Sequence, residues 1–187
     1  GAPAPFDPVE GVLDRLGVTA EVDVRPDVPL GCGFGASGAA TLATALAAAA
    51  TFELETNRES LLWAAHEAEV EAGTGLGDVF VQDRGGVVVG TEDGGIERYE
   101  PETEVGYDSF GGIATSEVLG DDGRMERIRE YGIDALSRFA GSDLSGLLAE
   151  GWTFAAATGL ATPRVVESVE SVQAVGGTAT MAMVGET

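Results

Sequence analysis

Residues 31–38 read Gly31-Cys32-Gly33-Phe34-Gly35-Ala36-Ser37-Gly38, and an alanine-rich segment follows them as far as about Thr51. This segment predicts a helix, because alanine has the highest helix propensity. The glycines before it include the spacing Gly-x-Gly-x-x-Gly. Backbone N–H groups of such a loop, together with the N-terminus of the following helix, form an anion-binding site. The stretch therefore indicates a loop that binds phosphate groups.

Two other interpretations of the loop are open. A tight strand-to-helix turn needs glycine for its backbone dihedrals and binds nothing. A dinucleotide-binding loop needs a buried parallel strand that runs straight into the first glycine. Here charged residues alternate along residues 18–25, and Pro26 and Pro29 intervene, which argues against it. Ser37 favours the phosphate loop, because a hydroxyl at this place can bind Mg²⁺ held between phosphate oxygens.

Acidic residues dominate the charge of the 187-residue chain. It holds 32 Asp and Glu against 10 basic residues, all of them Arg, so its formal net charge is −22. This balance disfavours binding to nucleic acids and to anionic membranes, and the lack of lysine excludes sites that depend on it. So acidic a surface is typical of a protein adapted to concentrated salt, where self-repulsion is screened. An acidic protein from an ordinary cytosol is the alternative.

Localisation is inferred from what the sequence does not contain. A single cysteine, Cys32, fits a reducing compartment. No secretory signal is visible, and the longest apolar stretch, residues 43–50, is too short to span a bilayer. We therefore expect a cytoplasmic protein.

Periodicity of the apolar residues predicts helices and strands without strict alternation, and hence the α+β class. Helices are expected over residues 12–16, 36–51, 57–72, 125–139 and 144–154, and from Thr162 onward. Strands are expected over residues 18–25, 78–82, 86–90 and 179–184. Thr56 and Glu59 suggest a capping box, and Gly73 a helix end. The acidic stretch 92–108 is the expected seam between two domains, residues 1–104 and 105–187.

Two carboxylates are candidates for chemistry. On a helical wheel Glu69 lies at the edge of an apolar face, where a carboxylate costs free energy unless it is paired or bound to a cation, whereas Glu67 points away. Asp78 follows a glycine-rich turn, where a rigid scaffold presents side chains, although an ordinary turn aspartate would fit the same place. His66, the only histidine, is better explained as a structural residue.

Residues 29–39 resemble the phosphate-binding motif of the GHMP kinases, which is Pro-x-Gly-x-Gly-Leu-x-Ser-Ser-Ala in outline. Phe34, Ala36 and Gly38 depart from that outline. The resemblance extends to residues 73–79, 115–119, 154–155, 158–162 and 182–185, and within the family it is greatest to the archaeal pantoate kinases. It covers most of the chain from about Val24 onward.

The resemblance implies a GHMP kinase-like two-domain fold with a ribosomal protein S5 domain 2-like N-terminal part, and ATP and Mg²⁺ as cofactors. The residues expected to bind the ATP phosphates are Gly31, Gly33, Phe34, Gly35, Ala36, Ser37 and Gly38. Ser37 and Glu69 would hold Mg²⁺, with Glu67 as a fallback, and Asp78 would accept the proton of the substrate hydroxyl. Arg84 is the candidate anchor for an anionic substrate, because it lies near Asp78 in the sequence.

The implied substrate is pantoate, phosphorylated to 4-phosphopantoate for coenzyme A synthesis, with a homodimer as a possible assembly. Another kinase of the family, acting on homoserine or mevalonate, is one alternative, and a nucleotide-binding module without turnover is another. Family members extend beyond both ends of this sequence, so the resemblance also implies that the chain is truncated at both ends.

Overall fold

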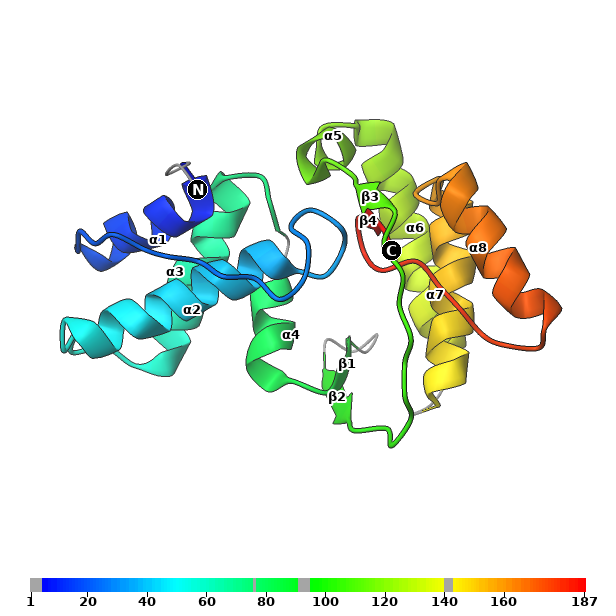
Figure 1. Ribbon diagram of the computed structural model, residues 1–187, viewed down its shortest axis with the longest axis horizontal. Helices are drawn as coiled ribbons and strands as arrows, with labels where there is room; N and C mark the ends of the chain where they lie inside the picture. Colours follow the sequence, from blue (N-terminus) through cyan, green and yellow to red (C-terminus); the bar gives the residue numbers. More distant parts are fainter. Residues whose placement is uncertain (1–4, 76, 91–94, 140–142) are drawn as a thin grey trace. The chain divides into compact units, whose positions relative to one another are not determined.

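The computed structural model describes residues 5–75, 77–90, 95–139 and 143–187. Its helices are α1 (Asp7–Leu16), α2 (Ala36–Thr51), α3 (Arg58–Glu71), α4 (Asp78–Arg84), α5 (Thr115–Leu119), α6 (Asp122–Arg138), α7 (Leu144–Thr158) and α8 (Pro163–Ala174) (Figure 1). Its strands are β1 (Val87–Gly90), β2 (Ile96–Tyr99), β3 (Gly111–Gly112) and β4 (Gly185–Glu186). Helices with short antiparallel strands give the α+β class, as predicted.

Contacts divide the chain into two compact units. The N-terminal unit comprises the residues up to Leu30 together with Phe34–Arg84, and the C-terminal unit comprises Gly31–Gly33 with Gly85–Thr187. The chain passes from the N-terminal to the C-terminal unit between Arg84 and Gly85, upstream of the boundary expected at residue 104. The assignment of two domains stays a prediction. Leu76 of the second glycine turn and residues 92–94 of the acidic seam lie outside the described residues.

Local signals set the ends of the helices in the N-terminal unit. Gly17 follows α1 with a φ of 68°, the left-handed conformation that commonly ends a helix. The N-cap of α3 is Asn57, whose Oδ1 accepts a hydrogen bond from Ser60 N at 2.8 Å. The predicted capping box at Thr56 is therefore wrong by one residue. The N-cap oxygen must reach the amide of the second or third helical residue, and Asn57 has that spacing.

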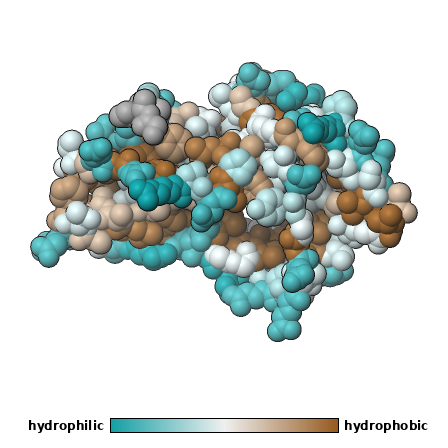
Figure 2. Space-filling view, viewed as in Figure 1, coloured by the Kyte–Doolittle hydropathy of each residue, from teal (hydrophilic) through white to brown (hydrophobic). Residues whose placement is uncertain are grey.

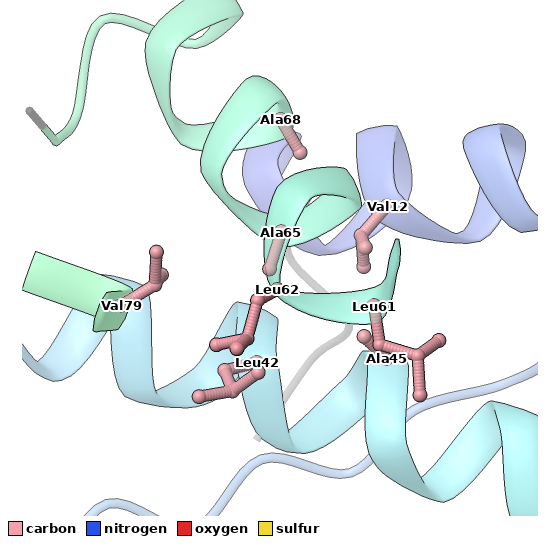
Figure 3. Close-up of a cluster of buried hydrophobic side chains, with 8 residues drawn as sticks. All are labelled: Val12, Leu42, Ala45, Leu61, Leu62, Ala65, Ala68 and Val79. Carbon is pink, nitrogen blue, oxygen red and sulfur yellow. The ribbon is translucent and has the colours of Figure 1, made fainter. Parts of the chain in front are cut away.

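The core of the N-terminal unit lies between α1, α2, α3 and α4. Figure 3 shows how its side chains converge from these helices: Val12, Leu42, Ala45, Leu61, Leu62, Ala65, Ala68 and Val79. Alanines on α2 and α3 let the helix backbones approach closely, while the leucines fill the remaining space. Truncating such a buried leucine to alanine costs about 2–5 kcal/mol, so this cluster fixes the positions of the helices that carry the site.

The C-terminal unit packs helices α5 to α8 with two short antiparallel ladders. One ladder pairs β1 with β2 and the other pairs β3 with β4. The core consists of Val118, Ala155, Leu160, Val165, Val169 and Met181. Side-chain caps start three of its helices, α6, α7 and α8: Asp121 accepts from Arg124 N, Asp143 from Ser145 N, and Thr162 from Val165 N. The expected helices of this region, including the one opened by Thr162, are confirmed.

The expected strand at residues 86–90 is confirmed as β1, but three other predicted strands are wrong. Residues 18–25 have no regular structure, and Val22 and Val24 are each 36% exposed. A period-2 pattern becomes a strand only beside a hydrogen-bonded neighbour, and no described strand pairs with this segment. Residues 179–184 are also irregular, and only Gly185–Glu186 form a ladder, with Gly111–Gly112.

Residues 78–82 form the start of helix α4 instead of a strand. Short apolar runs do not distinguish a buried strand from a buried helical turn by periodicity alone. The helix buries Val79 in the N-terminal core. It also places Asp78 and Gln82, four residues apart, on the same side.

Apolar side chains also reach the surface of each unit. Trp63 and Val70 on α3 are about half exposed, as is Ile96 on β2. On the face shown in Figure 2, apolar patches lie among hydrophilic residues. Within the described ranges, no helix is both long and apolar enough to cross a membrane.

Candidate active site

The site lies at the N-terminus of α2. Gly35 is the N-cap and has a φ of 67°, which a residue with a Cβ adopts only with strain. Gly35 has no side chain and so makes no side-chain capping hydrogen bond at this end of the helix. The first N–H groups of a helix have no partner within it, so an uncapped N-terminus can bind a phosphate group. Ser37 lies in the first turn of α2, at this end.

Gln82 connects α4 to the N-cap of α2. Its Nε2 donates a hydrogen bond to Gly35 O at 2.6 Å. Both residues belong to the N-terminal unit. The contact fixes α4, and therefore Asp78, relative to the start of α2.

Glu69 is the central residue of the site. Its side chain is fully buried (0% exposed), and three hydroxyls donate to its carboxylate. Ser37 Oγ lies 2.9 Å from Oε1 and 3.0 Å from Oε2, Thr41 Oγ1 lies 2.5 Å from Oε1, and Thr74 Oγ1 lies 2.9 Å from Oε2. A buried carboxylate costs free energy unless hydrogen bonds or a cation compensate it. The three hydroxyls provide that compensation from α2 and from the turn after α3.

Asp78 faces the same place from the start of α4. A Cβ added to Gly38 would lie 2.5 Å from Asp78 Oδ2. A Cβ added to Gly75 would lie 2.7 Å from Asp78 Oδ1 and 3.0 Å from Glu69 Oε2. The two carboxylates therefore converge on Gly75, and glycine at both positions leaves them room.

The surroundings of Asp78 disfavour the charged form of its carboxyl group. Burial raises the pKa of its carboxyl above the ordinary value, and the nearby charge of Glu69 raises it further. Asp78 Oδ1 is buried and has no hydrogen-bond partner among the described residues. A bound cation or a donor from a substrate would supply the missing interaction.

The residues fit a divalent cation of the hard type. Carboxylate and hydroxyl oxygens, which Mg²⁺ prefers, are the only side-chain ligands offered by Ser37, Glu69 and Asp78. The unpartnered Oδ1 of Asp78 and the glycines on either side of it are consistent with a group that is bound there. No group of three or more His, Cys, Asp or Glu that could hold a metal ion occurs in the described part of the chain.

Glu67 and Arg84, two of the predicted site residues, make other contacts. Glu67 lies 3.5 Å from Arg15 Nε, and its side chain is 63% exposed. Arg84 ends α4, and its Nη1 donates to Phe80 O at 3.1 Å. Neither residue is among those that gather around Glu69.

The predicted loop is divided between the two units. Gly31–Gly33 belong to the C-terminal unit, where Ile113 N donates to Gly31 O at 3.2 Å and Thr187 Oγ1 donates to Cys32 O at 2.6 Å. Phe34 to Gly38 belong to the N-terminal unit. The geometry described above concerns this second half of the loop.

A pocket of about 560 Å³ lies beside α2 within the N-terminal unit. Its walls come from residues 22–28, from the alanine-rich face of α2 and from Gln82. Pockets of roughly 300–1,000 Å³ with mostly apolar walls hold small ligands and cofactors. Phe34 and Ala36 also line it, so the pocket adjoins the start of α2.

Some residues of the site were missed by sequence reasoning. Thr41, Thr74 and Gln82 are ordinary polar residues in a helix, a turn and a short apolar run, and no motif distinguishes them. Thr41 carried one weak signal, because it lies four residues after Ser37 on the same face of α2. His66 packs against Trp63 and Phe80, with ring centroids 5.6 and 5.1 Å away, while its buried Nδ1 has no partner in the described chain.

The sequence of this chain is similar to a known protein family and to a known enzyme. The family model of the GHMP kinases N terminal domain matches residues 8–86. Pantoate kinase of Methanocaldococcus jannaschii is 30% identical over 190 residues, which cover 96% of this chain and 69% of the relative. No solved structure matches the chain significantly.

Proposed function

Since the chain belongs to the GHMP kinase family, we propose that it transfers the γ-phosphoryl group of ATP to the hydroxyl group of pantoate. The product would be 4-phosphopantoate, an intermediate for coenzyme A synthesis. The observation that carries the proposal is the convergence of Asp78 and Glu69 at the N-terminus of α2, beside Ser37. Similarity to a pantoate kinase supports the choice of substrate.

Asp78 is proposed as the base. Its carboxylate would accept the proton of the substrate hydroxyl while the hydroxyl oxygen forms a bond to the γ-phosphorus and the bond to the leaving ADP oxygen breaks. Such a base must lie within hydrogen-bond reach of the attacking oxygen. The unpartnered Oδ1 is available for that contact. A raised pKa makes the ionised form a stronger proton acceptor.

Ser37 and Glu69 are proposed to hold Mg²⁺, which when bound neutralises charge on the phosphate groups. Ser37 would turn an oxygen lone pair towards the cation, while Glu69 would contribute a carboxylate oxygen. Loop residues 31–38 would bind the phosphates through backbone N–H groups. The pocket beside α2 offers a volume suited to the nucleoside. Arg84 is proposed as the anchor for the carboxylate of pantoate.

ATP consumption tests the proposal. We expect turnover with Mg²⁺ and pantoate in concentrated KCl, where the repulsion of the net charge of −22 is screened. Homoserine and mevalonate are the matched competitors. Turnover with either of them instead would assign another reaction of the family. Nucleotide binding by folded protein without turnover on any of the three alcohols would contradict a kinase activity of this chain and favour a binding module.

A further inference from the structure

The hydroxyls around Glu69 are not equivalent. Ser37 Oγ lies nearly equally far from both carboxylate oxygens, at 2.9 and 3.0 Å. Each threonine approaches only one of the two carboxylate oxygens: Thr41 bonds Oε1 at 2.5 Å, and Thr74 bonds Oε2 at 2.9 Å. Each hydroxyl also lies near a backbone carbonyl, Ser37 O at 3.0 Å for Thr41 and Glu69 O at 3.3 Å for Thr74. The serine therefore spans the carboxylate, whereas the threonines hold its two oxygens separately.

This arrangement leaves lone pairs of the Glu69 carboxylate available to a cation without loss of the threonine contacts. A carboxylate has about four lone-pair sites, so it can accept two hydroxyl hydrogen bonds and still bind a metal ion. A hydroxyl has a single proton, and the Ser37 proton must leave the carboxylate when the serine oxygen turns towards a cation. The protons of Thr41 and Thr74 need not move.

We propose that Thr41 and Thr74 are positioning residues that orient both oxygens of Glu69 and thereby set the affinity of the site for a divalent cation. This inference rests on the proposed function, because it takes Glu69 as a cation ligand. Thr41 is fully buried on α2 and Thr74 is half-buried in the turn after α3, so the carboxylate is held from two different elements. Partners that orient metal ligands typically change metal affinity or activity by roughly 10- to 100-fold when they are removed.

The test compares Thr41→Val with a matched control. Valine has nearly the shape of threonine but no hydroxyl. Thr158→Val is the control, because Thr158 is equally buried and its hydroxyl donates to Phe154 O of its own helix at 2.9 Å. Binding of Mn²⁺ is measured by electron paramagnetic resonance in the presence of adenylyl imidodiphosphate. We expect the dissociation constant to rise by roughly 10- to 100-fold in Thr41→Val and to stay unchanged in Thr158→Val.

Two further variants keep the test decisive. Thr41→Ser restores the hydroxyl and should return the affinity towards that of the wild type. Thr74→Val changes a less buried position and should weaken Mn²⁺ binding in the same direction, even if Thr41→Val folds poorly. In EDTA, Thr41→Val should unfold at a lower denaturant concentration than Thr158→Val, because it loses a hydrogen bond to a buried carboxylate. When both variants also carry Glu69→Gln, this difference should disappear.

Two outcomes overturn the proposals separately. Equal Mn²⁺ affinity in the wild type and in both threonine-to-valine variants at positions 41 and 74 would overturn this inference alone. If the wild-type chain binds neither Mn²⁺ nor the nucleotide analogue, the proposed function fails, and the role of the threonines towards a cation fails with it.

Discussion

The two units of the protein bury polar side chains in different ways. In the C-terminal unit, the buried hydroxyl of Thr158 donates to carbonyl groups of its own helix. In the N-terminal unit the hydroxyls of Thr44 and Thr41 also lie within hydrogen-bond distance of carbonyls of their own helix, but Thr41 in addition donates to Glu69 on another helix. A hydroxyl satisfied within its helix needs no particular neighbour, whereas a buried carboxylate depends on several precisely placed donors. Among the described residues, only the N-terminal unit therefore contains a polar centre, the buried Glu69 carboxylate with its hydroxyl donors. Packing alone does not require such a centre.

Asp78→Asn should have the largest effect in this centre. An amide cannot accept the proton of the substrate hydroxyl, and loss of a general base lowers turnover by roughly 10²- to 10⁴-fold. Nucleotide binding should persist, because the substitution preserves the shape of the side chain. Steady-state kinetics with ATP and pantoate, together with nucleotide titration, measure both quantities. Turnover close to that of the wild type would exclude Asp78 as the base.

Glu69→Gln and Glu67→Gln separate two carboxylates of the same helix. Removing the charge of buried Glu69 should raise the Mg²⁺ concentration needed for half-maximal turnover. The increase should be at least the roughly 10- to 100-fold that is typical of residues that act on a metal indirectly. Glu67 is exposed and paired with Arg15, and exposed ion pairs contribute only about 0–1 kcal/mol to stability. Turnover measured as a function of Mg²⁺ concentration decides between them. A larger effect at Glu67 would make the fallback residue the ligand.

Gly38→Ala and Gly132→Ala compare a helical glycine in each unit. A Cβ at Gly38 would approach Asp78 Oδ2 to 2.5 Å and displace the carboxylate, and a misplacement of about 1 Å can lower turnover by about 10²-fold. A Cβ at Gly132 meets Phe154 at 3.7 Å, an ordinary contact. Alanine there should stabilise α6 by about 0.5–1 kcal/mol without changing turnover. Kinetics and chemical denaturation report the two effects, and normal turnover of Gly38→Ala would show that Asp78 has room to move.

The pH dependence of stability should give the smallest effect. The folded-state pKa of Asp78 is raised above the ordinary value of 3.8, so the fold favours the protonated carboxyl. At pH values below the unfolded-state pKa the carboxyl is protonated in both states and carries no penalty. As pH rises through the raised folded-state pKa, the ionised form destabilises the fold.

This effect is measured as a difference between variants. In EDTA, the free energy of unfolding of the wild type should fall relative to that of Asp78→Asn as pH rises from about 4 and should level off above the folded-state pKa of Asp78. Urea denaturation across that pH range provides the values. A difference that grows in the opposite direction would mean that the fold stabilises the ionised carboxylate.

Local patterns predicted some of these features well. The helical wheel placed Glu69 at an apolar edge, and the structure buries it completely. The glycine spacing predicted the loop before α2, where Gly35 has the left-handed conformation. The roles of these residues in binding remain predictions. The strand expected at residues 78–82 failed because a short apolar run is compatible with either structure, and packing of Val79 into the core selected the helix.

The sequence by itself determined the net charge of −22, the long helices, the glycine loop and the motifs of the kinase family. These features depend on composition or on residues within a few positions of one another, so they can be read along the chain. Only the tertiary structure decided that Thr41, Thr74 and Ser37 surround one carboxylate, and that Asp78 and Gln82 face the start of α2 from a helix. Hydrogen bonds between helices depend on how the helices pack, because a rotation of one helix by a single residue turns each side chain by about 100°.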